Sequence, residues 1–381
     1  MLKRAILMKA FAKFHRMVYF QRMMKPTDMV KLERDAAAGL ASLLNDVPFA
    51  HVENTQFEPN GSDSGADFVL NIMAEGRPFS LVCEIKANGQ PRQAREAIMQ
   101  LRNYVAHSAG DGAPVFIAPY VSEEVRRLCR ENGVNYYDLQ GNCQIILAGI
   151  YIERTVATKP VSERRELRSL FKPKSARVLR WLLRNPDRAH RLTEVAAAAQ
   201  VSIGQVHNVK EALLAREWAA STSDGFMLIR PGALLDAWRS AYESPPNERQ
   251  TFYTTLHGKP LEDAVRETLR EANAAGRAAL ASFSAADWIA PYVRSATLVL
   301  YADEAAQNAV RAGLRLTPQP QGANVLVLEP YDEGVFLDSI EPAPGVRTTS
   351  PVQTYLDLTT SGERGAEAAD HLRRERLAWS M

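Results

Sequence analysis

Two acidic residues and a lysine stand close together in two neighbouring segments that are otherwise apolar. Glu84 and Lys86 are two residues apart near the end of one run, and Asp67 begins the run before it. Because side chains alternate along a strand, Glu84 and Lys86 point to one face if this run is a β-strand. Two carboxylates suit Mg²⁺ or Mn²⁺, and a nearby ammonium group can position an attacking water. These residues predict a metal-dependent site that cleaves phosphodiesters.

The length of the turn between the two runs decides whether the acids meet. If the turn has two residues, Ala74 pairs with Arg77, and counting outward places Asp67 opposite Glu84. A turn of another length would shift this register. The alternative interpretation is an ordinary salt bridge at the end of a surface hairpin.

The surrounding sequence predicts the elements that position these groups. The spacing of apolar residues predicts a helix from Met29 to Leu44, and Pro91 opens a second helix that ends at His107. Ser122 caps a third helix, which stops at Asn132-Gly133. Short apolar runs predict strands at residues 67–73, 79–86, 114–119, 134–139 and 143–152. This order of helices and strands predicts a mixed-sheet α/β domain over residues 29–152.

The pattern resembles the PD-(D/E)xK nuclease superfamily over roughly residues 29–152. The resemblance is carried by Gly65-Ala66-Asp67, by Glu84-Ile85-Lys86 and, on the next helix, by Gln100-Leu101-Arg102-Asn103-Tyr104. Ala66 stands where the family usually has proline. The resemblance implies a restriction-nuclease-like fold in which Asp67 and Glu84 hold Mg²⁺ or Mn²⁺. It further implies that Lys86 activates the water, that Gln100 supports the site and that Glu33 on the first helix joins the metal ligands.

A segment further along the same domain has two interpretations. Residues 135–142 resemble a stretch that follows the nuclease core in some bacterial proteins, which implies that Asp138 and Asn142 line the site. The alternative is that they form a tight turn, for which Gly141-Asn142 is well suited.

The middle of the chain predicts a second kind of module. Helices are expected at 175–185, 193–200 and 203–216, followed by two short strands around a polar loop at 221–225. This order is that of a winged helix-turn-helix domain, here residues 174–244, whose third helix enters the major groove. The predicted buried stripe of that helix is Ile203, Val206, Val209, Leu213 and Leu214. The residues predicted to face DNA are Ser202, Gln205, His207, Asn208 and Lys210.

The segment before this module, residues 153–173, is rich in arginine and lysine and predicts a basic connector. Lys172 at its end, and Lys174 and Arg177 just after it, are expected to contact phosphates. A solvated linker is the alternative for the connector. A winged helix used only for protein contacts is the alternative for the module.

The last region, residues 245–381, predicts a C-terminal α/β domain. Together with the winged helix it resembles the AbiEi-type antitoxin and transcriptional regulator family. The likeness is carried by Ser282 to Ala286, Ser350 to Leu358 and His371-Leu372-Arg373. The resemblance implies a bacterial protein that represses its own operon on double-stranded DNA and opposes a nucleotidyltransferase-like toxin. A nuclease-like N-terminal domain is a departure from that family and puts the plain antitoxin role in doubt.

Composition narrows the setting. The 381 residues are enough for two or three domains, and the net charge of +2 indicates no particular partner. Cys83, Cys129 and Cys143 are far apart in sequence, which predicts free thiols in a reducing cytoplasm. No apolar run is long enough to span a membrane, so a cytoplasmic protein is expected.

Residues 1–28 combine many bases with aromatic side chains and hold no acid before Asp28. They predict a basic arm that lies on DNA or on a membrane surface. The alternatives are a poorly ordered leader or a start of translation nearer Met24 or Met29.

Two functions of different classes follow. One is a DNA-binding regulator, favoured by the C-terminal resemblance; the other is a Mg²⁺-dependent nuclease that its own winged helix brings to DNA, favoured by Asp67, Glu84 and Lys86. The DNA site and the oligomeric state are left open by the sequence.

Overall fold

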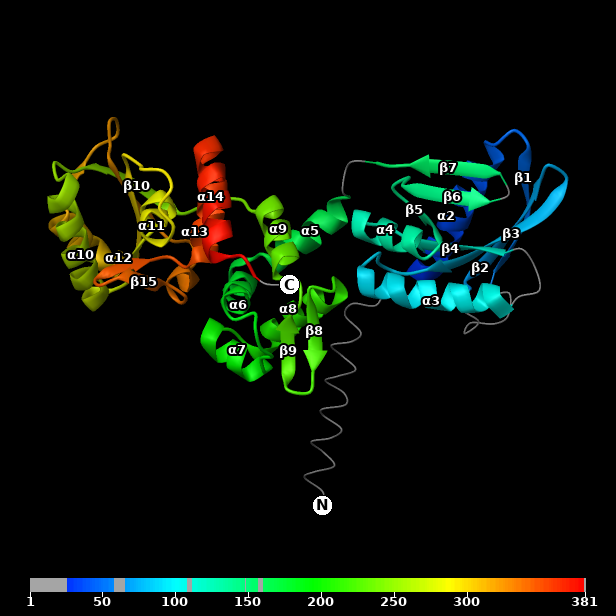
Figure 1. Cartoon of the computed structure of the whole chain (residues 1–381), viewed down its shortest axis with the longest axis horizontal. Helices are drawn as coiled ribbons and strands as arrows, with labels where there is room; N and C mark the ends of the chain where they lie inside the picture. Colours follow the sequence, from blue (N-terminus) through cyan, green and yellow to red (C-terminus); the bar gives the residue numbers. More distant parts are fainter. Residues whose placement is uncertain (1–25, 58–65, 108–111, 148, 157–159, 380–381) are drawn as a thin grey trace, which may run out of the picture. The chain divides into compact units, whose positions relative to one another are not determined.

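The computed structural model describes residues 26–57, 66–107, 112–147, 149–156 and 160–379, and the chain divides into two compact units (Figure 1). The N-terminal unit comprises residues 1–163 and the C-terminal unit residues 164–381. Both units combine helices with mixed sheets, which confirms the predicted α/β class. Residues 1–25 of the predicted basic arm lie outside the described residues.

In the described part of the N-terminal unit, one sheet of seven strands follows the chain in sequence order from β1 to β7. Its strands β3 and β4 and its strands β4 and β5 pair in parallel, and the other neighbours are antiparallel. The strands are β1 (Ala50–Phe57), β2 (Phe68–Ala74), β3 (Arg77–Ile85), β4 (Gly112–Ala118), β5 (Asn135–Asp138), β6 (Cys143–Leu147) and β7 (Ile150–Arg154).

Helices cover both faces of this sheet (Figure 1). Helix α2 (Pro26–Asn45) packs on the face formed by Phe68, Leu70 and Ile72 of β2 and by alternate residues of β3. Helices α3 (Pro91–His107) and α4 (Glu123–Glu131) pack on the other face, against Val82 and the strands that follow. Because side chains alternate along a strand, Val82 and Glu84 of β3 both point to the face that α3 covers.

Most elements of this unit agree with the sequence prediction. The helix predicted from residue 91 to 107 has these bounds in the structure, and Ser122 caps α4 by accepting the backbone N–H of Val125. Strand β1 was not predicted, because only its first residue is buried. The single strand predicted over residues 143–152 is wrong: it is the hairpin of β6 and β7, in which Leu147 pairs with Ile150 and Gly149 has φ +84°.

The C-terminal unit begins within α5 (Val161–Leu170), which occupies part of the predicted basic connector. The three helices predicted next are present as α6 (Pro173–Arg184), α7 (Leu192–Ala199) and α8 (Ile203–Ala215). The two predicted strands form the antiparallel hairpin of β8 (Ala219–Thr222) and β9 (Gly225–Leu228), and α9 (Pro231–Ala241) follows. His190 pairs with Phe226 and fixes the hairpin to the loop between α6 and α7.

A second sheet, of seven strands in the described residues, follows these helices in the order β13-β10-β14-β12-β11-β16-β15. Its strands are β10 (Glu248–Tyr253), β11 (Ala278–Leu280), β12 (Leu298–Ala302), β13 (Thr317–Pro318), β14 (Val325–Glu329), β15 (Ile340–Ala343) and β16 (Val346–Thr348). The helices around it are α10 (Gly258–Ala275), α11 (Ser282–Ile289), α12 (Glu304–Gly313), the 3₁₀ helix η1 (Glu333–Phe336), α13 (Pro351–Thr359) and α14 (Gly362–Arg376).

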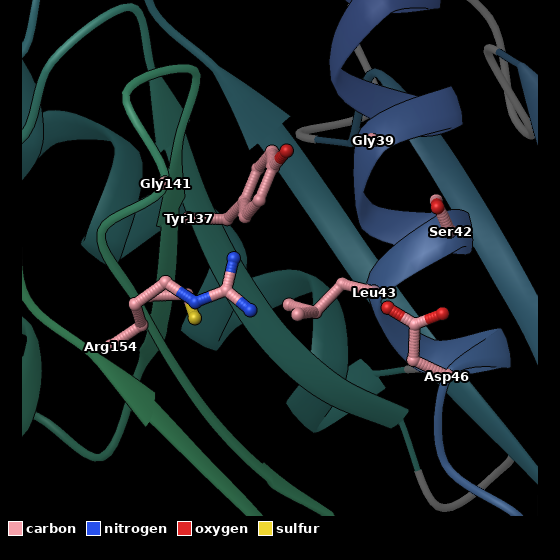
Figure 2. Close-up of a pocket in the computed structure, with 8 residues that line it drawn as sticks. Gly39, Ser42, Leu43, Asp46, Tyr137, Gly141 and Arg154 are labelled. Atoms are coloured by element: carbon pink, nitrogen blue, oxygen red, sulfur yellow. The ribbon is translucent and has the colours of Figure 1, made fainter.

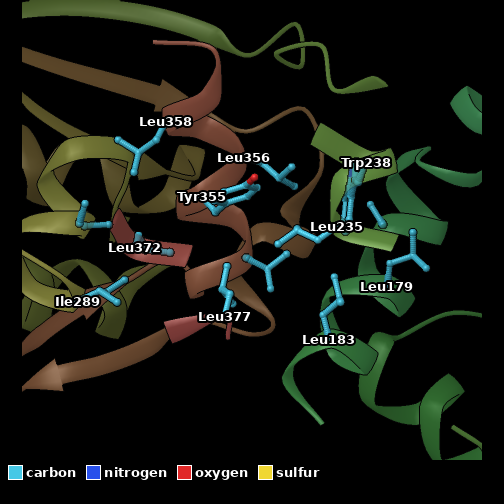
Figure 3. Packing of buried hydrophobic residues seen from close by; sticks show 14 of the residues in the cluster. Leu179, Leu183, Leu235, Trp238, Ile289, Tyr355, Leu356, Leu358, Leu372 and Leu377 are labelled. Atoms are coloured by element: carbon cyan, nitrogen blue, oxygen red, sulfur yellow. The ribbon is translucent and has the colours of Figure 1, made fainter. Parts of the chain in front are cut away.

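One apolar core runs through the C-terminal unit from Leu170 to Leu377. Figure 3 shows Leu179 and Leu183 of α6 beside Leu235 and Trp238 of α9, with Tyr355 and Leu356 of α13 next to them. The segments 174–244 and 245–381, which the sequence predicts as separate domains, therefore share one core within this unit.

Candidate functional site

The hairpin of β2 and β3 has the register that the sequence predicts. Ala74 pairs with Arg77, and the ladder continues to Phe68 opposite Cys83. One position further, the backbone N–H of Asp67 donates to the carbonyl of Cys83 at 2.9 Å. Asp67 and Glu84 are therefore neighbours at the end of the hairpin, as expected for a two-residue turn.

Glu84 is the buried centre of this end of the hairpin, with only 6% of its surface exposed. Nζ of Lys86 donates to its Oε1 at 2.6 Å and also to Oε1 of Gln100 on α3 at 3.2 Å. Burial raises the pKa of Glu84, and the negative charge of Asp67 raises it further; the hydrogen bond and charge of Lys86 act against this. Glu84, Lys86 and Gln100 are thus brought together on the α3 face.

Asp67 uses one carboxylate oxygen within the hairpin itself. Its Oδ2 accepts the backbone N–H of Ile85 at 2.6 Å. Two carboxylates of adjacent strands that repel each other make a donor set of the kind that Mg²⁺ or Mn²⁺ takes. A bound cation of this kind would polarise a phosphate oxygen and supply a reactive water.

Glu33 is the third carboxylate that the resemblance to the nuclease superfamily offers as a metal ligand. It lies on α2, which packs on the opposite face of the sheet. Within the described ranges, no three His, Cys, Asp or Glu side chains form a group that could hold a metal ion. The described residues bring Asp67 and Glu84 together as a carboxylate pair, and the role of Glu33 as a further ligand stays a prediction.

Asp138 and Asn142 form a turn with a structural role. Both side chains are fully buried, and the Asp138 carboxylate accepts the backbone N–H groups of Val121, Gln140 and Asn142, each at 2.9 Å. The Asn142 side chain adds a fourth hydrogen bond at 2.7 Å. With four donors on one carboxylate, Asp138 ties the β5–β6 turn to the segment before α4, as the tight-turn interpretation expects.

Helix α8 differs from the prediction at three residues. Val206, Val209 and Leu213 are buried, but Ile203, predicted in the same stripe, is 50% exposed, and Leu214 is only half-buried. Nε2 of Gln205 donates to Oγ of Ser175 on α6 at 2.8 Å, so this amide is turned towards α6. The residues of α8 that stay on the outside are Ser202 and Asn208, which are exposed, and His207 and Lys210, which are partly exposed.

Of the three cations predicted to contact phosphates, two are accessible. Lys172 and Lys174 are exposed at the start of α6. Arg177 is instead half-buried and bound to Asp332, which precedes η1. Its guanidinium already has a carboxylate partner within the C-terminal unit, and its phosphate contact stays a prediction.

A buried polar network within the C-terminal unit was not predicted. Arg180 of α6 is 4% exposed and donates to Asp338 at 3.3 Å and to Gln353 of α13 at 3.0 Å. Gln353 donates in turn to Asp357, which also accepts the hydroxyl of Tyr242 at 3.1 Å. The polar residues inside the apolar run from Ser350 to Leu358 were the available sequence signal, because buried polar groups need partners.

A small pocket lies beside the turn that Asp138 and Asn142 form. It opens between α2 and strands β5 to β7 of the N-terminal unit and has a volume of about 130 Å³. Figure 2 shows Arg154 and Asp46 on opposite sides of it, with the ring of Tyr137 between β5 and α2. Ligand pockets usually measure about 300–1,000 Å³. This pocket is therefore too small to serve as the candidate site.

Comparison with known proteins gives one match. The model of the family described as "Transcriptional regulator, AbiEi antitoxin, Type IV TA system" matches residues 227–378. The match begins inside β9 and ends two residues after α14. The predicted resemblance of the C-terminal region to this family is thereby confirmed for these residues. No curated protein and no solved structure shows significant similarity to the chain. In the described residues, no helix is long and apolar enough to cross a membrane.

Proposed function

We propose that this chain is a DNA-binding transcriptional regulator of the antitoxin type. The observation that carries this proposal is the family match over residues 227–378, which lies in the same apolar core as the three helices α6 to α8. These helices and the hairpin of β8 and β9 have the order of a winged helix, in which α8 is the recognition helix. The exposed Lys172 and Lys174 supply phosphate contacts beside it.

The test is binding of the full-length chain to the DNA upstream of its own gene, measured at several salt concentrations. The logarithm of affinity should fall linearly with that of salt, by about 0.9 per phosphate contacted. Lys172→Ala and Lys174→Ala should each reduce the slope by about one phosphate contact. Lys259→Ala, an exposed lysine of α10, is the control and should leave the slope unchanged. An affinity that does not change with salt concentration, or no binding, would refute the proposal.

The antitoxin part of the proposal concerns a second partner, a nucleotidyltransferase-like toxin encoded beside this chain. Both genes are expressed from unrelated promoters, so that repression of the natural operon does not enter the result. Growth arrest by the toxin should be relieved by the chain and by its Lys172→Ala, Lys174→Ala double variant. Unrelieved arrest would remove the antitoxin role and leave the DNA-binding role standing.

A second candidate function, a Mg²⁺- or Mn²⁺-dependent PD-(D/E)xK nuclease, is favoured by the contacts among Glu84, Lys86 and Gln100. In this proposal Asp67 and Glu84 hold the cation, and Lys86 holds the water through its ammonium group. The test is cleavage of plasmid DNA with Mn²⁺ by the wild type, Glu84→Gln and Lys86→Ala. Activity in the wild type alone supports the nuclease; equal nicking by all three proteins indicates a contaminant and removes it.

A further inference from the structure

Ile203 is an aliphatic side chain left half exposed on the first turn of α8. Residues of an α-helix advance by about 100° each, so steps of three drift by about 60° per step. Ile203 is therefore turned about 120° away from Val209, which is buried in the core. Its neighbours Ser202 and Gly204 are exposed too. The first turn of α8 thus presents one apolar group on a polar surface.

The surroundings of Ile203 carry positive charge. The hydrogen bond from Gln205 to Ser175 places the start of α8 beside the start of α6, where Lys172 and Lys174 are exposed. Neither helix has an acidic residue in its first turn. Two helix N-termini with two lysines attract a polyanion, so charge complementarity indicates nucleic acid at this surface.

The residue after Ile203 is Gly204, so the backbone there carries no side chain. Glycine inside a helix costs about 1 kcal/mol relative to alanine, yet Gly204 occupies the second position of α8. A Cβ added there would have only Oγ of Ser202 within reach, at 4.0 Å, so no packing within the chain requires a glycine. Without a side chain at this position, the first turn can approach a partner closely.

We propose that Ile203 contacts the C5-methyl group of a thymine in the major groove. This inference rests on the proposed function and names the base that the DNA site contains. Thymine is the base that presents a methyl group in the major groove, and apolar side chains are its usual contacts. Lys210, which is turned only about 20° from Ile203 around the helix, then faces a neighbouring polar base edge. Gln205 is a positioning residue, because its amide holds α8 to α6.

The experiment uses the full-length chain and DNA sites selected from a random library. In the selected site, each thymine is replaced by uracil, which lacks only the methyl group. At one position the replacement should weaken wild-type binding about fourfold, which is the effect of one buried methyl group. Ile203→Ala should bind the thymine site more weakly than the wild type does. It should bind the thymine site and the uracil site with equal affinity. Ile229→Ala, at a site that is 47% exposed, is the matched control and should behave as wild type.

Two further variants keep the test decisive. Ile203→Val retains branched methyl groups and should retain the preference for thymine, whereas Ile203→Ser should lose it. Melting temperatures equal to wild type show that these variants are folded. If no variant and no wild-type protein selects any DNA sequence, the proposed function fails. If the wild type selects a sequence but uracil has no effect, or has the same effect in Ile203→Ala, only the role of Ile203 is overturned.

Discussion

Arg177 and Asp332 form a two-pronged ion pair, in which Nε and Nη2 of the arginine each lie 2.8 Å from one carboxylate oxygen. The pair joins α6 to the segment before η1, and both side chains are largely buried. Paired hydrogen bonds of this geometry are among the stronger ion contacts in proteins. Arg177 thus belongs to the framework that holds α6 in place.

This geometry predicts strong coupling between the two residues. Arg177→Ala and Asp332→Ala should each destabilise the C-terminal unit, and the double variant should be less destabilised than the sum by about 1–3 kcal/mol. Denaturant unfolding of the four proteins measures this coupling. The salt dependence of DNA binding should be the same for folded Arg177→Ala as for wild type. A smaller slope of log affinity against log salt in Arg177→Ala would show that Arg177 contacts a phosphate.

Asp357 predicts a pH dependence of stability. Burial raises its pKa from about 3.8 to about 6, although hydrogen bonds from Gln353 and Tyr242 act against the shift. Because the pKa is higher in the folded state, the folded state binds the proton more tightly. The protonated carboxyl group of Asp357 therefore stabilises the fold. This contribution is complete below pH 3.8 and is lost as pH rises through about 6. The loss amounts to about 3 kcal/mol at pH 7.

Asp357→Asn removes this titration. Within the described ranges, Oδ2 of Asp357 is buried without a hydrogen-bond partner, so the amide nitrogen can replace it there. We expect the variant to be more stable than wild type at pH 7 and equal to it near pH 4. The measurement is the free energy of unfolding of the C-terminal unit between pH 4 and 8. Asp224→Asn, at the exposed tip of the hairpin of β8 and β9, is the control and should follow wild type. If the free energy of unfolding of Asp357→Asn depended on pH as that of the wild type does, Asp357 would not be the group that titrates.

Asp67 and Glu84 predict a response to divalent cations that does not depend on cleavage. A cation that binds only the folded state at 100 times its Kd raises stability by about 2.7 kcal/mol. Mn²⁺ should raise the melting temperature of the N-terminal unit in wild type and in the exposed control Glu53→Gln. Asp67→Asn and Glu84→Gln should abolish the shift.

The same cation response should depend on pH. Since the pKa of Glu84 is raised, protons compete with the metal at higher pH than they would at an ordinary glutamate. The Mn²⁺ shift should therefore shrink as pH falls through this raised value. A shift that persists in Glu84→Gln would place the metal elsewhere, and no shift in wild type would leave the chain without this metal site.

The shared core predicts which pieces of the C-terminal unit can fold. Residues 227–378 alone lack Leu179, Leu182 and Leu183 of α6, all buried against the rest of the unit. Each such side chain contributes about 1.5–3 kcal/mol, which together rivals the whole stability of a typical domain. A fragment of residues 164–381 should unfold cooperatively in a thermal melt, whereas residues 227–378 should show no cooperative transition. Cooperative unfolding of the shorter fragment would contradict the shared core.

The sequence predicted elements wherever the spacing of apolar residues was strong, as in α3. It predicted the pairing of Ala74 with Arg77 on the assumption of a two-residue turn, which the structure has. It missed β1, because an edge strand with one buried residue shows no alternation of polarity. It could not assign Arg177 or Gln205, because their partners depend on tertiary packing: Asp332 lies 155 residues further along the chain, and Ser175 lies on another helix. Ile203 was misplaced because spacing by three residues drifts around a helix.

The continuous core also constrains how such a chain can be assembled in evolution. An exchange of coding sequence at the boundary between residues 163 and 164 would cut the first turn of α5 but leave the core from Leu170 to Leu377 whole. An exchange at residue 227, where the family match begins, would cut through β9 and separate α6 from α13. The shared core therefore favours inheritance of the C-terminal unit as one piece.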